Sequence, residues 1–146
     1  MDKWQIDKLI EENVAEFTDT YFWSKLNSNA AVTRAEDLQM QYAGVDVQLS
    51  TSTSLVNFDE KAKVRGCLNS VLQYPSFELK MTARSGARRD GWFFSALSTD
   101  YYAFISVSAD TTAENDLSCD GRISAIDMLW VKKDDIEDMV HEHMTD

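Results

Sequence analysis

Two aspartates and a lysine on neighbouring strand-like segments are the residues of this chain best suited to chemistry. Residues 44–49 read Gly-Val-Asp-Val-Gln-Leu and contribute Asp46. Residues 55–64 read Leu-Val-Asn-Phe-Asp-Glu-Lys-Ala-Lys-Val and contribute Asp59 and Lys61. Two carboxylates supply the oxygen ligands that a hard divalent cation prefers, and a nearby lysine stabilises charge that develops on a phosphate. The pattern therefore indicates metal-dependent cleavage of a phosphodiester bond.

Side-chain alternation supports this interpretation. Successive side chains of a strand point to opposite faces, so Asp59 and Lys61 share the polar face of the second segment. If the two segments pair through the Ser/Thr-rich turn at residues 50–54, Asp46 joins that face. Glu60 interrupts the apolar face. An ordinary two-stranded ribbon with one solvated face also has such a pattern, so a purely structural role stays open.

Bulk properties indicate a single acidic domain over residues 1–146. The chain has 44% hydrophobic residues, only one proline and five glycines, so a core is expected and no linker stands out. The formal net charge of −11 repels nucleic acid at long range. A nuclease of this composition needs a local basic patch, a partner or a metal ion. The same charge suits a protein that presents carboxylates to a basic partner.

The sequence also predicts a cytoplasmic location without membrane contact. No apolar run is long enough to cross a bilayer, and the N-terminal residues lack the order of a secretion signal. Cys67 and Cys119 are therefore expected as free thiols in a reducing compartment.

Periodicity indicates the elements that would position the candidate residues. A helix is expected over residues 4–26 and another over residues 134–144, where apolar side chains recur at helical spacing. A sheet is expected over residues 37–107 and 122–131. Residues 27–36 resemble a loop or a short helix.

Within the sheet region, strands are expected at residues 77–81, 91–94 and 99–107, the last being the most strongly buried. Residues 37–41 are expected to lead into the first strand. Gly44 precedes Asp46 at a position where the lack of a Cβ atom lets backbone or ligand approach closely.

Other carboxylates could complete a metal site. Glu16, with Glu12 as the alternative, could add one from the N-terminal helix, although solvated surface glutamates give the same pattern. Glu78 and Lys80 form a rival Glu-x-Lys motif, and Glu78 could contribute from a neighbouring strand.

The most cationic stretch of the chain contains Arg84, Arg88 and Arg89. Arginine clusters suit contact with phosphates, so these residues are candidates for nucleic-acid binding. A solvated hairpin tip explains them equally well.

Five short motifs follow the first helix in a familiar order. They are Gly44-x-Asp46, the segment Val-Asn-Phe-Asp-Glu-Lys-Ala at residues 56–62, Phe77-Glu78, Gly91-Trp92 and Thr99-Asp100-Tyr101-Tyr102. Over roughly residues 37–107, and loosely over the final strand and helix, this order resembles small members of the PD-(D/E)XK nuclease superfamily. The resemblance implies an α/β fold with a mixed central β-sheet flanked by helices, like that of restriction endonucleases.

The resemblance also implies a ligand set and a reaction. Mg²⁺ or Mn²⁺ would be held by Asp46 and Asp59, with the backbone carbonyl of Glu60 as a further ligand. Lys61 would be the catalytic lysine. A helical glutamate often completes such sites, which again points to Glu16 or Glu12.

We therefore expect a divalent-metal-dependent nuclease that hydrolyses DNA. One alternative is a non-catalytic acidic binding protein, such as a phage-type inhibitor of a nucleic-acid enzyme that has a basic surface. Another is a regulatory module of the same fold with a decayed site. Metal affinity at Asp46 and Asp59 would separate these functions.

Overall fold

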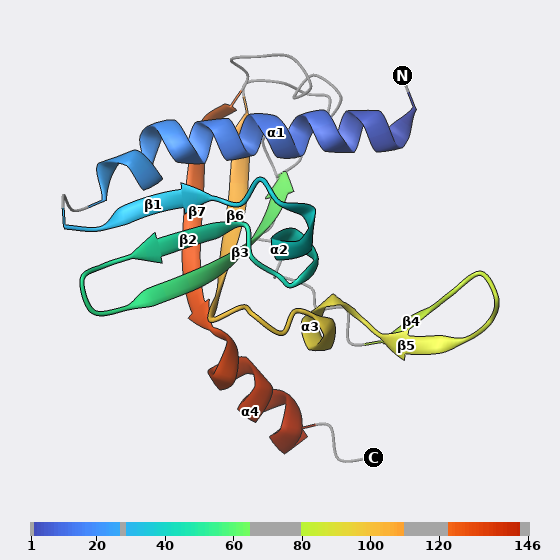
Figure 1. Cartoon of the computed structure of the whole chain (residues 1–146). Helices are drawn as coiled ribbons and strands as arrows, with labels where there is room; N and C mark the ends of the chain where they lie inside the picture. Colours follow the sequence, from blue (N-terminus) through green and yellow to red (C-terminus); the bar gives the residue numbers. More distant parts are fainter. Residues whose placement is uncertain (1, 27–28, 65–79, 110–122, 144–146) are drawn as a thin grey trace. The chain divides into compact units, whose positions relative to one another are not determined.

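The computed structural model describes residues 2–26, 29–64, 80–109 and 123–143. These residues form a mixed α/β structure in which helices flank a five-stranded sheet, together with a separate two-stranded sheet (Figure 1). In chain order the elements are α1 (Lys3–Tyr21), the 3₁₀ turn η1 (Trp23–Lys25), β1 (Ala31–Arg34), α2 (Leu38–Tyr42), β2 (Val47–Ser50), β3 (Leu55–Val64), β4 (Lys80–Thr82), β5 (Arg88–Asp90), α3 (Trp92–Ser95), β6 (Tyr101–Ala109), β7 (Ile123–Lys132) and α4 (Lys133–His143).

The larger sheet has the strand order β1-β2-β3-β6-β7. Strands β1, β2 and β3 form an antiparallel meander. The N–H of Asp100 donates to the carbonyl of Asn57 at 3.0 Å, so β6 begins beside the start of β3 and both run in the same direction (Figure 1). The N–H of Lys133, just past β7, donates to the carbonyl of Asp100 at 2.9 Å, so β7 returns antiparallel to β6. The expected mixed sheet is therefore confirmed.

The chain divides into two compact units, each described by itself. The first comprises Met1–Ser28, Lys61–Tyr74 and Phe104–Leu129, and the second comprises Asn29–Glu60, Pro75–Ala103 and Trp130–Asp146. The prediction of one domain over residues 1–146 stays a prediction.

The first unit is built on helix α1. A capping box begins the helix, because the Asp2 carboxylate accepts the Gln5 N–H at 2.9 Å and the Gln5 side chain accepts the Asp2 N–H at 3.0 Å. The apolar stripe expected from the sequence then meets strand β6. Its core cluster consists of Ile10, Val14, Ile105 and Val107.

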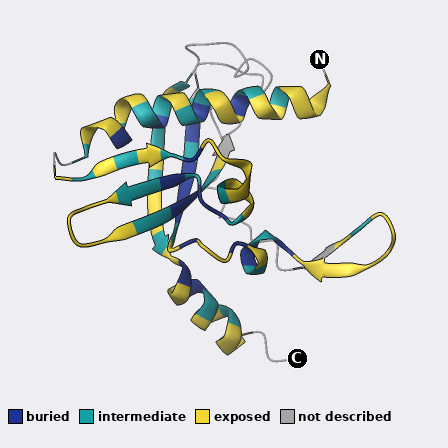
Figure 2. Ribbon diagram, viewed as in Figure 1, coloured by how far each residue is buried: buried dark blue, intermediate teal, exposed yellow. Residues whose placement is uncertain are grey.

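The core of the second unit lies around the β2–β3 hairpin and the start of β6, and Figure 2 shows buried residues concentrated there. Val47 and Phe58 are paired across the hairpin and are both buried. The Phe58 ring packs on Tyr101 and Trp130, with centroids 5.6 and 4.7 Å away. Tyr102, the next residue of β6, instead packs against Phe93 of α3. The hairpin is thus held by packing as well as by its own ladder.

Several predicted elements are confirmed. Helices α1 and α4 and strands β6 and β7 lie where periodicity indicated them, and the hairpin turn joins Ser50 to Leu55. Of the expected strand at residues 77–81, only residues 80 and 81 are described, and they begin β4. Across the described part of the chain, no helix is both long and apolar enough to span a membrane.

Three local predictions were wrong. Residues 27–36 were expected to contain a loop or a short helix, but Ala31–Arg34 is a strand that pairs with β2. Residues 44–49 were expected to form the first strand, but β2 begins only at Val47, after helix α2 and a turn, and Asp46 lies just before the strand. Residues 91–94 were expected as a strand, yet Trp92–Ser95 is helical because its aromatic rings pack against Tyr102.

Candidate acidic site

Asp46 and Asp59 lie beside the last residue pair of the β2–β3 hairpin. Val47 pairs with Phe58, Asp46 directly precedes Val47, and Asp59 directly follows Phe58. The carboxylate of Asp46 accepts the N–H of Glu60 through Oδ2 at 2.8 Å. Asp46 therefore lies against the peptide group that joins Asp59 to Glu60. We call Asp46 and Asp59 the acidic pair.

The backbone of Asp46 is fixed on both sides. Its N–H donates to the carbonyl of Phe58 at 2.8 Å, and its carbonyl accepts the N–H of Ala35 at 2.8 Å. Together with the bond to Glu60, these contacts tie Asp46 to β3 and to the end of β1. These three hydrogen bonds consequently fix the position of the Asp46 carboxylate.

Gly44 is a point of close approach, as expected from its place before Asp46. Its φ of +80° lies in the left-handed region, and a Cβ atom there would lie 2.3 Å from Thr99 Oγ1 and 2.5 Å from Ala96 Cβ. The Thr99 hydroxyl donates to the Gly44 carbonyl at 2.6 Å. Only glycine can accommodate this contact two residues before Asp46.

Asp59 is buried, with 3% of its surface exposed. Its charge affects the pKa of Tyr102 on the adjacent strand. Burial raises the pKa of the Tyr102 hydroxyl above its ordinary value, and the negative charges of Asp59 and Glu137 raise it further. This hydroxyl lies 3.4 Å from the carbonyl of Phe93, to which it donates. Tyr102 therefore places a neutral hydroxyl in the electrostatic neighbourhood of Asp59.

Lys61 lies two residues beyond Asp59 in the unbroken strand β3 and is half-buried. Strand alternation puts these two residues on the same face of β3, as predicted. The strand passes from the second unit to the first between Glu60 and Lys61.

The side chain of Glu60 forms an ion pair with Arg34 of β1 at 2.7 Å. This contact explains why an acidic residue interrupts the apolar face of β3. Arg34 could not be identified from the sequence, because its partner lies 26 residues away. The interruption itself was the one available signal that Glu60 needs a partner. The predicted metal ligand at Glu60 is its backbone carbonyl, which stays a prediction.

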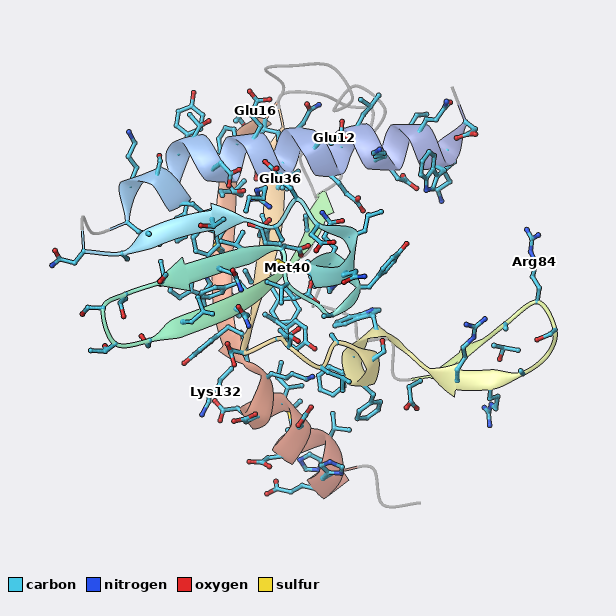
Figure 3. The ribbon with its side chains drawn as sticks, in the orientation of Figure 1. Glu12, Glu16, Glu36, Met40, Arg84 and Lys132 are labelled. Atoms are coloured by element: carbon cyan, nitrogen blue, oxygen red, sulfur yellow. The ribbon has the colours of Figure 1, made fainter. Side chains whose placement is uncertain are left out.

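The other candidate acids are not brought to the acidic pair by any described contact. Glu12 and Glu16 are exposed residues of α1 in the first unit (Figure 3). Glu78 lies outside the described residues. The contribution of a further acid therefore stays a prediction.

The three arginines occur on the β4–β5 hairpin, which forms a two-stranded sheet of its own. Arg84 lies in the turn and points away from it, and Arg88 and Arg89 belong to β5 (Figure 3). All three are exposed (Figure 2). The two interpretations of this stretch, a solvated hairpin and a phosphate contact, both stay open, and the role of the arginines in nucleic-acid binding stays a prediction.

The acidic pair resembles an open metal site with two carboxylates more than a closed site built from three or more side chains. Within the described residues, no group of three or more His, Cys, Asp or Glu side chains is placed to hold a metal ion. Mg²⁺ is usually bound through one or two carboxylates and completes its shell with waters and substrate phosphates. Asp46 and Asp59 have the donor set of that open type of site. No protein-family model, curated protein or solved structure matches the chain.

Proposed function

We propose that this chain is a divalent-metal-dependent nuclease that hydrolyses DNA at the acidic pair. The observation that carries the proposal is the 2.8 Å bond from the Glu60 N–H to the Asp46 carboxylate, which joins the two separate parts of the Asp…Asp-x-Lys motif. The mixed sheet flanked by helices is the coarse architecture that a PD-(D/E)XK nuclease would have. A restriction-endonuclease-like core is part of this proposal.

The proposed roles follow from the chemistry of each side chain. Asp46 and Asp59, with the Glu60 carbonyl, would hold Mg²⁺ or Mn²⁺. The bound ion would supply an acidified water and stabilise charge on phosphoryl oxygens. Lys61 would direct its ammonium group at the negative charge that develops on the phosphate. Tyr102 contributes no second negative charge near Asp59, because its hydroxyl stays protonated.

The exposed arginines support binding of a polyanionic substrate. Arg84, Arg88 and Arg89 supply forked donors that suit phosphate oxygens, and their concentration on one hairpin gives local positive charge in a chain of net charge −11. In this role they would contact the DNA backbone without regard to base sequence.

A second candidate function is favoured by a different surface. Helix α4 exposes the carboxylates of Asp134, Asp135, Asp138 and Glu142. Such a surface suits a non-catalytic protein that binds a basic surface of a nucleic-acid enzyme, as an inhibitor or a regulatory module.

Cleavage of supercoiled plasmid and single-stranded DNA with Mg²⁺ or Mn²⁺ tests the nuclease proposal. EDTA and Asp59→Asn should each abolish activity, and Asp135→Asn, which changes an exposed carboxylate of α4, should retain it. A folded wild-type protein that cleaves no DNA would contradict the proposal. Competition between this chain and DNA for a basic DNA-binding protein would then test the second candidate.

A further inference from the structure

Residues 98–100, between α3 and β6, form hydrogen bonds with residues that precede each member of the acidic pair. On the β2 side, the Ser98 N–H donates to the carbonyl of Ala43 at 3.0 Å. The Thr99 hydroxyl donates to the carbonyl of Gly44 at 2.6 Å. These bonds hold the chain two to three residues before Asp46.

On the β3 side, the same segment holds Asn57, two residues before Asp59. The Asn57 N–H donates to the Asp100 carboxylate at 2.8 Å, and the Asn57 carbonyl accepts the Asp100 N–H at 3.0 Å. The Asn57 side-chain amide donates to the Ser98 carbonyl at 3.0 Å. Its amide oxygen accepts from Gln48 of β2 at 2.9 Å. Asn57 is therefore bonded through its backbone and through both ends of its side chain.

The 98–100 segment is itself anchored by the start of α4. The carbonyl of Asp100 accepts the Lys133 N–H, and the buried Lys133 ammonium donates to the carbonyl of Ala96. Lys133 also forms an ion pair with Glu137 at 3.5 Å. Bonds from three directions therefore hold residues 98–100, which makes the segment a fixed support for the strands it contacts.

We infer that Asn57 and Asp100 are positioning residues that hold Asp46 and Asp59 together before a metal ion binds. The Asp46 carboxylate is bonded to the peptide group that follows Asp59, and two carboxylates so close along the fold repel each other, so an unsupported pair would move apart in the absence of a cation. The bonds from residues 98–100 to Gly44 and Asn57 oppose that movement. The positioning itself is a property of the metal-free protein. Its consequence, tighter metal binding, rests on the proposed function.

Amide hydrogen exchange at Glu60 in the metal-free protein tests the positioning directly, because this N–H reports the place of the Asp46 carboxylate. In Asp100→Ala and Asn57→Ala, Glu60 should exchange at least about fivefold faster, the factor that corresponds to one ordinary hydrogen bond. Asp100→Asn retains an oxygen that can accept the Asn57 N–H and should restore most of the protection. Asn57→Ala keeps its backbone bonds to Asp100 and serves if Asp100→Ala does not fold.

Thr51→Ala is the matched control at the opposite end of the same hairpin. The Thr51 hydroxyl accepts the Ser54 N–H at 3.1 Å, so this variant removes a comparable bond far from the acidic pair. It should leave exchange at Glu60 unchanged. Unchanged Glu60 exchange in both Asp100→Ala and Asn57→Ala, or equal acceleration in Thr51→Ala, would overturn the inference.

Mn²⁺ affinity, measured by electron paramagnetic resonance, separates this inference from the proposed function. The Mn²⁺ dissociation constant should rise about tenfold or more in Asp100→Ala, as is typical when a group that orients a metal ligand is lost, and should not change in Thr51→Ala. A wild-type protein that binds no Mn²⁺ would count against the proposed function. The exchange rates at Glu60 would still decide whether Asn57 and Asp100 position Asp46.

Discussion

The β2–β3 and β4–β5 hairpins carry the two polar motifs of the chain, and the motifs differ in burial and in their bonding to the rest of the protein. In β2–β3, Asp59 is buried and the Asp46 carboxylate is bonded to the backbone of β3. In β4–β5, all three arginines are exposed on a separate two-stranded sheet. A carboxylate removed from water must be held by its neighbours, whereas an exposed arginine keeps its hydration and adapts to a ligand. Only the first hairpin therefore has a site geometry that the fold determines.

The largest effect is expected from Asp59→Asn. This change keeps the shape of the side chain and removes the charge, so DNA cleavage should fall by about a hundredfold to a thousandfold or more. Initial rates of plasmid nicking with Mg²⁺ give the measurement, and the urea midpoint shows whether the fold is kept. Full activity in Asp59→Asn would show that the β2–β3 hairpin does not carry the catalytic site. Unfolding of the variant would indicate a structural role for Asp59.

The variants Gly44→Ala and Gly86→Ala compare how tightly the backbone is packed in the two hairpin regions. Gly44 and Gly86 have φ values of +80° and +81°, but an added Cβ at Gly44 would meet Thr99 and Ala96, whereas at Gly86 it would meet nothing within 4 Å. Gly44→Ala should therefore lower the free energy of unfolding by about 2–4 kcal/mol. Gly86→Ala in the β4–β5 turn should lower it by about 1–2 kcal/mol. Equal losses in urea unfolding would show that the packing around Gly44 is not restrictive.

Removal of the arginines should affect binding without affecting the acidic pair. Each of Arg84→Ala, Arg88→Ala and Arg89→Ala should reduce the slope of log K against log[salt] by about 0.9 if that residue contacts a DNA phosphate. Mn²⁺ affinity and stability should not change. Fluorescence anisotropy with labelled DNA at several salt concentrations gives the slopes, and the exposed Lys25→Ala is the control. Slopes that match the wild type would exclude this hairpin from DNA binding.

The smallest effect is expected from Tyr102→Phe and appears only at high pH. The pKa of Tyr102 in the folded protein lies above the unfolded value of 10.0, so its contribution to stability is present below pH 10 and is lost as the pH rises above it. The wild type should therefore lose stability more steeply than Tyr102→Phe above pH 10. Urea midpoints between pH 8 and 11 measure this difference, and parallel curves for the two proteins would contradict it.

Local patterns were sufficient to predict the long elements and the hairpin that carries the acidic pair. Strand β6, helix α4 and the turn between β2 and β3 have clear periodicity or turn chemistry. Strand β1 has only four residues, and its state is decided by pairing with β2. The aromatic run of α3 favours a strand by intrinsic preference, but its packing against Tyr102 stabilises a helix.

The same distinction applies to the candidate site. Asp59 and Gly44 could be identified because their neighbours along the chain define a strand parity and a close approach, whereas Asp46 was identified from a strand that begins one residue after it. Asn57 and Asp100 could not, because they are 43 residues apart and their bonds exist only once β6 lies beside β3. Residues that carry a motif are thus more predictable than residues that position it.

Crystals of the protein grown with Mn²⁺ would test the central claim most directly, since the anomalous signal of the ion locates it without reference to activity. We predict an anomalous peak within coordinating distance of both Asp46 and Asp59, and no such peak in Asp59→Asn. A well-ordered acidic pair without a peak at saturating Mn²⁺, or a peak bound only elsewhere on the protein, would contradict it.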